Sequence, residues 1–335
     1  MITQPRFKTV LVTGGAGYVG SALVPRLLDE GYRVKVLDLY LYGESALREV
    51  RAHPHLDEIK GDIRDHQLLA RIIPGCDALI HLACISNDPS FELNPELGRS
   101  INYEAFRGLV DRACEGGVKR FIYASSSSVY GVKAEEHVTE DLPVEPLTDY
   151  SKYKAMCEEI LLNEPYDGLE RVVIRPATVC GYSPRLRLDL TVNILTNHAV
   201  NNRKIMVFGG QQKRPNIHIK DMVEVYVQSL TWPAEKVNGQ VFNAGYHNLR
   251  VDDIAQMVKQ NVGEDVEIVH METNDHRSYH ISSEKIARTL GFTPQHSVQD
   301  AIGDLLSAFR EGHIPNSFDD SRYFNIKRMQ EVQLV

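Results

Sequence analysis

Thr13-Gly-Gly-Ala-Gly-Tyr-Val-Gly20 decides the fold, because it joins the apolar run at residues 9–12 to an amphipathic stretch that begins at Gly20. Gly14 at the turn tolerates positive φ, Gly17 lets the backbone approach a phosphate, and Gly20 lets the helix touch the strand. The free N–H groups and the helix dipole can then receive a pyrophosphate. Three glycines alone also fit an ordinary turn, so the strand before them and the helix after them carry the prediction.

The first half of the chain repeats one pattern, a short β-branched run followed by a turn and an amphipathic stretch. This pattern predicts an α/β fold with a doubly wound parallel sheet of the Rossmann type. The predicted strands lie at residues 9–12, 34–37, near 59, 78–82, 121–124 and 172–174, and the clearest helices at 20–30, 102–115 and 150–163.

The composition changes after Arg175-Pro176, where a Gly-, Pro- and Arg-rich passage begins. Residues 217–219, 221–230 and 241–244 read as strand, helix and strand that return to the sheet, and the segment beyond Ile314 gives no clear pattern. We therefore expect two domains. A cofactor domain comprises residues 1–178 plus about 215–245, and a smaller α/β substrate-binding domain comprises about 179–214 plus 246–335.

Charge and cysteine content restrict the partners. The chain has 37 Lys plus Arg against 45 Asp plus Glu, so its formal charge of -8 argues against a nucleic-acid partner. Its five cysteines are odd in number and never spaced as C-x-x-C, which is typical of a reducing cytoplasm. No signal-like segment and no apolar stretch of roughly 20 residues is found, so we expect no membrane association.

Asp38 follows the second predicted strand, where a carboxylate can accept both hydroxyls of an adenine ribose. Leu39, Tyr40 and Leu41 come next and offer no cation for an added 2′-phosphate, so the expected cofactor is NAD. Asp62-Ile63, after the third strand, either frames the adenine or forms a polar turn.

Tyr150-Ser-Lys-Tyr-Lys154 opens a predicted helix and places Tyr150 and Lys154 one turn apart on one face. An ammonium group near a phenol lowers the phenol's pKa, which would make Tyr150 a general base for a sugar hydroxyl. Tyr323 and Lys327 repeat the spacing, so spacing alone does not decide.

Position separates the two copies, because Tyr150 lies just after Ala124-Ser-Ser-Ser-Ser-Val-Tyr-Gly131, which ends a central strand. Hydroxyls at the carboxyl end of a parallel strand point into the ligand crevice, and we select Ser126 to bind the reacting oxygen. A solvated turn is the alternative for this serine run.

Together, TGGAGYVG, Asp38, His81-Leu-Ala83, SSSSVYG and YSKYK resemble the extended short-chain dehydrogenases/reductases of the NAD-dependent nucleotide-sugar epimerase/dehydratase family. The resemblance spans about residues 9–293. It implies that Tyr150 takes the proton, that Lys154 orients the cofactor and acidifies the tyrosine, and that Ser126 binds the sugar oxygen. The implied cofactor-binding residues are Gly14, Gly17, Tyr18, Val19, Gly20, Asp38, Asp62, Ile63, Leu82, Ala83, Tyr150 and Lys154.

The resemblance also implies that Arg214 and Arg277 bind the diphosphate of a nucleotide-diphosphate sugar, the expected substrate. The family's dehydratases carry Asp-Glu where this chain has Ser127-Ser128, which disfavours elimination of water. Thr178 and Leu190 replace asparagines of many relatives, and relatives form homodimers through helices that correspond to residues 102–115 and 150–163.

Several further residues near the crevice receive no catalytic role. His81 is expected to be a packed structural residue. Cys84, Ser86 and Asn87 follow the fourth strand and could touch the substrate. No spacing typical of metal ligands occurs, so no metal site is predicted.

Three functions agree with these residues. The leading hypothesis is an epimerase that works through a transient keto intermediate. The second is an NAD(H)-dependent ketoreductase or dehydrogenase of a sugar or keto-sugar nucleotide. The third is a noncatalytic NAD-binding regulator that kept the fold.

Overall fold

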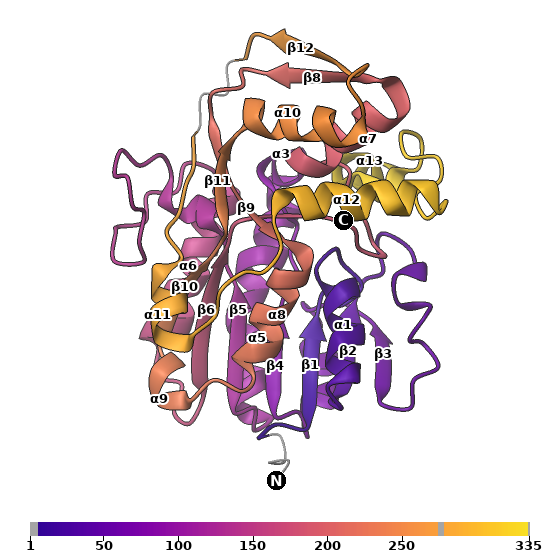
Figure 1. The fold of residues 1–335 in the computed structure, drawn as a ribbon. Coiled ribbons are helices and arrows are strands. Elements are labelled where there is room, and N and C mark those ends of the chain that lie inside the picture. Colours follow the sequence, from indigo (N-terminus) through magenta and orange to yellow (C-terminus); the bar gives the residue numbers. More distant parts are fainter. Residues whose placement is uncertain (1–5, 274–277, 334–335) are drawn as a thin grey trace.

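A seven-stranded parallel sheet forms the centre of the computed structural model, which describes residues 6–273 and 278–333 (Figure 1). Its strand order is β10-β6-β5-β4-β1-β2-β3, and the direction of winding changes between β1 and β4. This arrangement confirms the predicted doubly wound α/β fold. The strands are β1 (Thr9–Thr13), β2 (Arg33–Asp38), β3 (Leu56–Lys60), β4 (Ala78–His81), β5 (Arg120–Ala124), β6 (Glu170–Pro176) and β10 (Gln240–Ala244).

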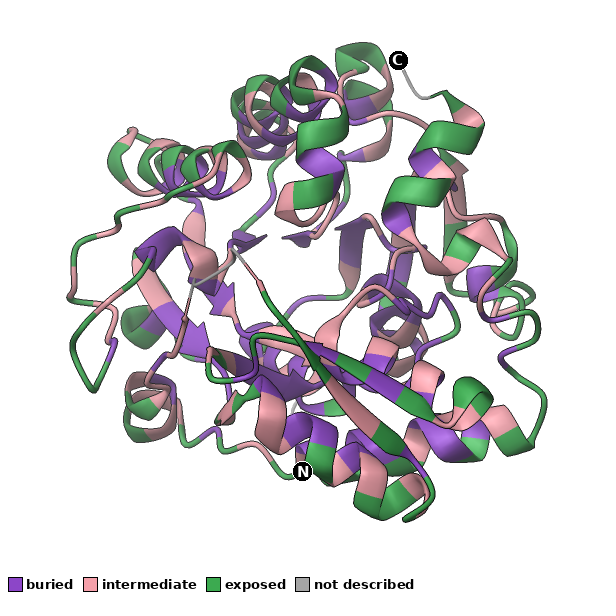
Figure 2. Cartoon of the chain, turned by 90° about the horizontal axis from the view of Figure 1, so that it is seen from above, coloured by how far each residue is buried: buried purple, intermediate pink, exposed green. Residues whose placement is uncertain are grey.

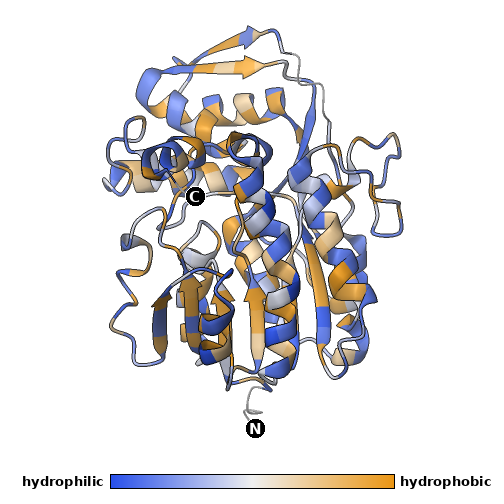
Figure 3. Ribbon diagram, turned by 180° about the vertical axis from the view of Figure 1, so that it is seen from behind, coloured by the Kyte–Doolittle hydropathy of each residue, from blue (hydrophilic) through white to orange (hydrophobic). Residues whose placement is uncertain are grey.

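Two apolar cores cover the two faces of this sheet, because successive side chains of a strand point to opposite faces. Val10 and Val12 belong to the core formed with helices α1 and α8, whereas Leu11 belongs to the core formed with α2, α5 and α6. The inner strands are mostly apolar and the helices two-sided (Figure 3), so both faces are covered. These helices are α1 (Gly20–Asp29), α2 (His66–Ile72), α5 (Ala105–Glu115), α6 (Asp149–Asn163) and α8 (Ile219–Ser229).

The starts of two predicted helices can be compared with the structure. A capping box between Thr148 and Ser151 starts α6 at Asp149, so Tyr150 lies in its first turn. The helix expected from residue 102 is instead entered through a π-helical turn, Ser100–Glu104. Short helices complete the periphery: α3 (Asp88–Leu93), α4 (Pro95–Arg99), α9 (Ala234–Val237) and α11 (Glu284–Leu290).

A smaller α/β part lies over the carboxyl ends of the central strands (Figure 1). It contains a three-stranded sheet, β11-β9-β7, a two-stranded sheet, β12-β8, and its own apolar core. Viewed from above, buried residues gather on the inner sides of the helices and exposed residues on their outer sides (Figure 2). The elements are β7 (Thr178–Cys180), α7 (Thr191–Asn202), β8 (Lys204–Phe208), β9 (Lys213–His218), β11 (His247–Arg250), α10 (Val251–Val262), β12 (Glu267–Met271) and α12 (Val298–Arg310).

Of the two late strands predicted to join the central sheet, only one does so. Residues 217–219 were expected to form a strand of that sheet, but β9 pairs with β7 and β11 in the smaller part. Only β10 joins the central sheet, parallel to β6. A short apolar run predicts a strand without indicating which sheet accepts it, and the division into two domains stays a prediction.

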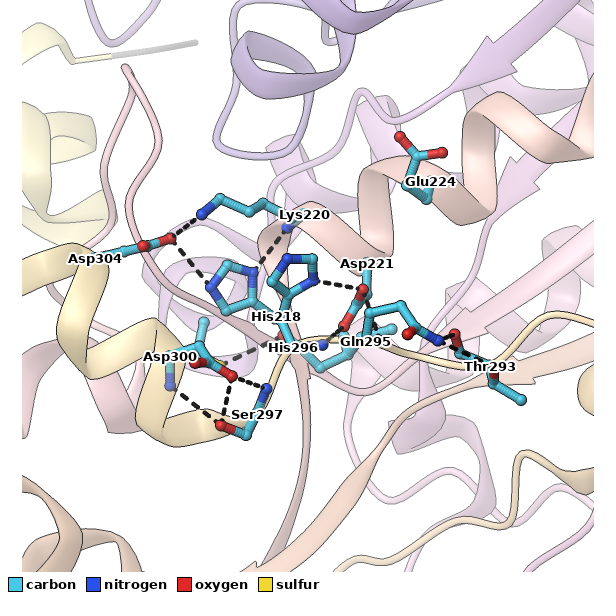
Figure 4. A network of polar contacts seen from close by, with 12 residues as sticks. His218, Lys220, Asp221, Glu224, Thr293, Gln295, His296, Ser297, Asp300 and Asp304 are labelled. Atoms are coloured by element: carbon cyan, nitrogen blue, oxygen red, sulfur yellow. Dashed lines mark hydrogen bonds and ion pairs between the residues drawn. The ribbon is translucent and has the colours of Figure 1, made fainter.

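A polar cluster joins α8 to α12 (Figure 4). His218 is buried, its Nδ1 accepts the Lys220 backbone N–H at 3.0 Å, and its Nε2 lies 3.3 Å from Asp304 Oδ2. His296 stacks on His218 and contacts Asp221 Oδ1 through Nδ1 at 2.8 Å. Because these residues bond one another and do not line the cavity described below, we assign them to the joint between the two parts.

The segment that gave no sequence pattern forms a short 3-10 turn, Ser321–Tyr323, and the helix α13 (Asn325–Val332). It returns to the first half of the chain, where Arg328 Nε donates to the Leu41 carbonyl at 2.6 Å and Asn325 Nδ2 donates to Ser86 Oγ at 2.9 Å. Among the helices of the described residues, none has the length and apolar character needed to span a bilayer.

Candidate active site

A cavity of about 560 Å³ opens at the carboxyl ends of the central strands. Every predicted site residue within the described ranges lines it, whereas Arg277 lies outside the described residues. The predicted residues that the structure brings together are Gly14, Gly17, Tyr18, Val19, Gly20, Asp38, Asp62, Ile63, Leu82, Ala83, Ser126, Tyr150, Lys154 and Arg214.

The glycine loop forms one end of the cavity. Gly14 has φ +76°, and a Cβ there would lie 2.6 Å from the Ala83 nitrogen. A Cβ on Gly20 would lie 2.4 Å from the Gly14 carbonyl oxygen, whereas one on Gly17 would meet only that oxygen, at 3.1 Å. The open side of Gly17 and the start of α1 therefore leave room for a pyrophosphate beside backbone N–H groups.

Asp38 ends β2 and is held by two backbone donors. Its Oδ2 accepts from the Ala16 nitrogen at 2.9 Å and its Oδ1 from the Tyr40 nitrogen at 2.7 Å. Burial nevertheless raises the pKa of Asp38. Each oxygen retains a lone pair for a ribose hydroxyl. The side chain of Asp62 instead accepts from Arg64 Nη2 at 2.7 Å, which occupies part of its hydrogen-bonding capacity.

The three predicted catalytic residues meet at the other end of the cavity. Ser126 lies two residues after the end of β5, and its hydroxyl stabilises the ionised form of the Tyr150 phenol by hydrogen bonding. Lys154 is 3% exposed, donates from Nζ to the Ala124 carbonyl at 2.6 Å, and lies 5.9 Å from the centre of the Tyr150 ring. The strand end and the first turns of α6 thus hold a hydroxyl, a phenol and an ammonium group together.

The arrangement of glycine loop, ribose acid and Tyr-Lys pair agrees with one known family. The model of the NAD dependent epimerase/dehydratase family matches residues 10–245. The chain belongs to this family. It is accordingly an NAD-dependent enzyme of the extended short-chain dehydrogenase/reductase class, which confirms the family, the cofactor and the enzymatic character predicted from the sequence.

Individual members of the family extend the similarity over nearly the whole chain. The UDP-glucose 4-epimerase of Lactobacillus helveticus is 27% identical over 335 residues, which cover 93% of this chain and 99% of that protein. DesIV, a dTDP-glucose 4,6-dehydratase from Streptomyces venezuelae solved with NAD, is 26% identical at a TM-score of 0.82, covering 90% and 97%. A Thermotoga maritima UDP-glucose 4-epimerase shares the fold at 24% identity and a TM-score of 0.82, covering 91% and 99%.

One electrostatic prediction for this family member is wrong in the structure as it stands. Lys154 was expected to lower the pKa of Tyr150, but burial raises that pKa, and the carboxylate of Asp88 adds to the increase. Arg187 and the hydroxyl of Ser126 act in the opposite direction. Desolvation of the phenolate outweighs both, because Tyr150 is half-buried where it lines the cavity.

The polar residues around Ser126, Tyr150 and Lys154 mostly form hydrogen bonds with other residues of the protein. Ser125 donates its hydroxyl to the buried Glu158. Ser126 and Ser128 hydroxyl oxygens lie 2.8 Å apart. His81 Nδ1 contacts Thr13 Oγ1 at 2.7 Å, and burial lowers its pKa to about 3, as suits a packed neutral ring.

The loop after β4 was considered for substrate contact, and its side chains do line the cavity. Ser86 Oγ accepts from Arg187 Nη1 at 3.1 Å and from Asn325, while Asn87 Oδ1 caps α3 through the Ser90 nitrogen at 3.0 Å. Thr178 and Leu190 line the cavity as well. Arg214 does so from β9, with Nη1 donating to the Lys213 carbonyl at 3.0 Å.

The sequence analysis missed one wall of the cavity. Arg185 and Arg187 belong to the loop between β7 and α7, line the cavity, and are only 5% and 8% exposed. Asp189 of the same loop and Asn325 of α13 complete this wall. The only sequence signal is the alternation Arg185-Leu-Arg-Leu-Asp189, which by itself also fits an exposed strand.

Proposed function

We propose that the protein is an NAD-dependent epimerase that acts on a nucleotide-diphosphate sugar through a transient keto intermediate, with Tyr150 as general base. The support comes from the placement of Ser126, Tyr150 and Lys154 around one cavity that also contains the glycine loop. The relatives named for UDP-glucose epimerisation are similar along nearly their whole length.

The observation that carries this choice within the family is the chemistry at residues 127 and 128. Hydroxyl groups line the cavity there, whereas the resemblance places an acid and a base at these positions in dehydratases. Among the described residues, the carboxylates that line the cavity are already engaged: Asp38 with backbone N–H groups, Asp62 with Arg64, Asp88 with Thr148 and Asp189 with Arg187. Within residues 6–273 and 278–333, elimination of water therefore has no unengaged acid–base pair beside Tyr150.

Each of the three catalytic residues has its own role in the proposed reaction. Bound NAD supplies the hydride acceptor and donor. Tyr150 takes the proton of a ring hydroxyl and later returns it, and the Ser126 hydroxyl donates a hydrogen bond to the same oxygen. Lys154 places a positive charge beside the developing phenolate. The keto-sugar turns over before reduction, so the configuration of one ring carbon is inverted and no cofactor is consumed.

The experiment measures two properties of the purified protein. We expect NAD to remain bound through purification, and we expect nuclear magnetic resonance to detect conversion of a UDP-sugar to its epimer without added NADH. A parallel screen of UDP, GDP, CDP and dTDP sugars by thermal shift selects the nucleotide, because a bound ligand raises the melting temperature.

The second candidate is a ketoreductase or dehydrogenase of a sugar or keto-sugar nucleotide, which needs the same three residues. Free exchange of the cofactor, together with turnover that requires one equivalent of NADH, would show that the protein is a ketoreductase or dehydrogenase and not an epimerase.

We also propose a homodimer through α5 and α6, as in the relatives implied by the resemblance. Met156 on α6 is 36% exposed, which gives this face an apolar contact. Light scattering coupled to gel filtration measures the mass of the particle. We expect Met156→Glu to yield a monomer. The control, Met206→Glu on β8, should remain a dimer.

A further inference from the structure

The loop between β7 and α7, residues 181–190, is fastened to the start of α1. The Tyr18 hydroxyl donates to the Gly181 carbonyl at 2.6 Å, and Ser183 Oγ donates to the Tyr18 carbonyl at 2.6 Å. Ser21 and Ser183 hydroxyl oxygens lie 2.7 Å apart. The loop therefore keeps a fixed position beside the glycine loop, where Arg185 and Arg187 line the cavity.

Arg185 of this loop carries a buried charge without a carboxylate partner. Its Nη2 donates to Asn325 Oδ1 at 2.5 Å and its guanidinium group stacks 3.5 Å from the centre of the Tyr42 ring, so both contacts are neutral. Within residues 6–273 and 278–333, Arg185 forms no ion pair and its Nε has no hydrogen-bond partner. A buried cation of this kind is costly unless an anion joins it.

Arg187, in the same wall, also has a hydrogen-bond donor without a partner. Its Nε donates to Asp189 Oδ1 at 2.9 Å and its Nη1 to Ser86 Oγ, but its Nη2 is buried without a partner. Asp189 neutralises one of the two guanidinium charges, so the pair Arg185 and Arg187 retains a net positive charge at the cavity wall.

The two arginines lie close to each other, between the predicted ribose end of the cavity and its catalytic end. Arg185 interacts electrostatically with Asp38, the acid at the predicted ribose end, and Arg187 with Tyr150 at the catalytic end. The start of α1 lines the same cavity. An anion that joins these two ends would pass between the N–H groups of α1 and the two unused guanidinium donors.

We propose that Arg185 and Arg187 bind the pyrophosphate of the NAD dinucleotide together with the glycine loop and thereby retain the cofactor. This inference rests on the NAD of the proposed function but not on epimerisation. A 2′-phosphate at the ribose is a poorer anion for Arg185, because the Asp38 carboxylate would repel it. The diphosphate of the sugar nucleotide has the same chemistry as the pyrophosphate, so the experiment distinguishes these two sources.

Isothermal titration measures the dissociation constants of NAD, ADP-ribose, adenosine and UDP for the cofactor-stripped protein and for Arg185→Met and Arg187→Met. We expect each variant to bind NAD and ADP-ribose about 10-fold to 100-fold more weakly, in line with a lost charge-assisted hydrogen bond. Adenosine, which has no phosphate, and UDP should bind within about twofold of wild type. Arg185→Lys keeps the charge without the planar fork and should fall between wild type and Arg185→Met.

Arg120 provides the matched control, since it is also fully buried but lies outside the cavity and is paired with Glu170. Arg120→Met should lower the melting temperature strongly and leave the NAD dissociation constant of the folded protein unchanged. Arg185→Met should lower the melting temperature of the stripped protein much less, because no ion pair is broken.

Two results overturn the proposal. Unchanged NAD and ADP-ribose affinity in both Met variants would show that the arginines do not bind the pyrophosphate. Weakened UDP binding with intact NAD binding would assign them to the sugar nucleotide. Because binding is measured without turnover, an absence of epimerase activity in the wild type affects the proposed function and leaves this test intact.

Discussion

Glu158 and Arg175 form a buried ion pair one helical turn beyond Lys154, with Arg175 Nη2 2.6 Å from Glu158 Oε2. The two side chains are 6% and 7% exposed, and the Ser125 hydroxyl also donates to Glu158. The pair ties α6, which carries Tyr150, to β6 and to the residue before Ser126. The geometry of the catalytic residues therefore depends on an ion pair that does not line the cavity.

Glu158→Ala should destabilise the protein by about 3 to 5 kcal/mol, because Arg175 would remain buried without its partner. Urea unfolding gives this free energy. Glu30→Ala breaks the exposed pair with Arg26 on α1 and is the control, with an expected cost of less than about 1 kcal/mol. Equal losses in the two variants would contradict the structural role given to the buried pair.

Gly20 and Gly303 offer a matched test of the glycine loop. An Ala Cβ at Gly20 would lie 2.4 Å from the Gly14 carbonyl oxygen, so Gly20→Ala should displace the loop and weaken NAD binding at least about tenfold. Gly303 lies within α12 with nothing near its Cβ position, and Gly303→Ala should stabilise the protein by up to about 1 kcal/mol. Titration with NAD and thermal unfolding measure the two effects, and unaltered NAD binding by Gly20→Ala would refute the close-contact argument.

His81 makes the stability depend on pH. Burial lowers its pKa to about 3 in the folded protein, whereas an unfolded histidine has a pKa near 6.5. The unfolded chain therefore takes up a proton first, so the contribution is complete above pH 6.5 and decreases as the pH falls towards 3. By pH 5 this single group should have cost about 2 kcal/mol of stability.

Unfolding by urea at pH 7 and at pH 5 measures this effect. In His81→Asn the difference between the two pH values should shrink by about that amount, although packing losses make the variant less stable at both. An unchanged pH difference would mean that His81 is not the neutral buried group described here. His218, whose pKa burial lowers to about 4, adds a loss of the same sign in both proteins.

The sheet, the glycine loop and the position of Tyr150 were predictable because each depends on residues close together in the chain. Strand, turn and helix follow one another within residues 9–29, and Tyr150 and Lys154 share one helical turn. Periodicity and turn chemistry act over such short distances. The membership of β9 in the smaller part was not predictable in this way, since its partners β7 and β11 are chosen by tertiary packing.

The wall formed by Arg185, Arg187 and Asn325 was missed for the same reason. Arg185 and Asn325 are 140 residues apart in the chain and meet only in the folded protein. Their burial follows from neither charge nor periodicity, because arginine is seldom buried without a partner. The pKa of Tyr150 was likewise misjudged, since spacing indicates a nearby ammonium group but not the loss of solvent around the phenol.

Tyr150 and Tyr323 share the same spacing to a lysine and give the sharpest test of the catalytic site. Tyr150→Phe removes the hydroxyl that lies in the cavity, whereas Tyr323 does not line it. We expect Tyr150→Phe to reduce kcat by about 10²-fold to 10⁴-fold, the usual contribution of a general base, with NAD still bound. Tyr323→Phe should leave kcat within about twofold, because spacing to a lysine has no catalytic effect outside the cavity. Turnover by Tyr150→Phe at the wild-type rate would remove the phenol from the mechanism, and the proton would then need another acceptor in the cavity.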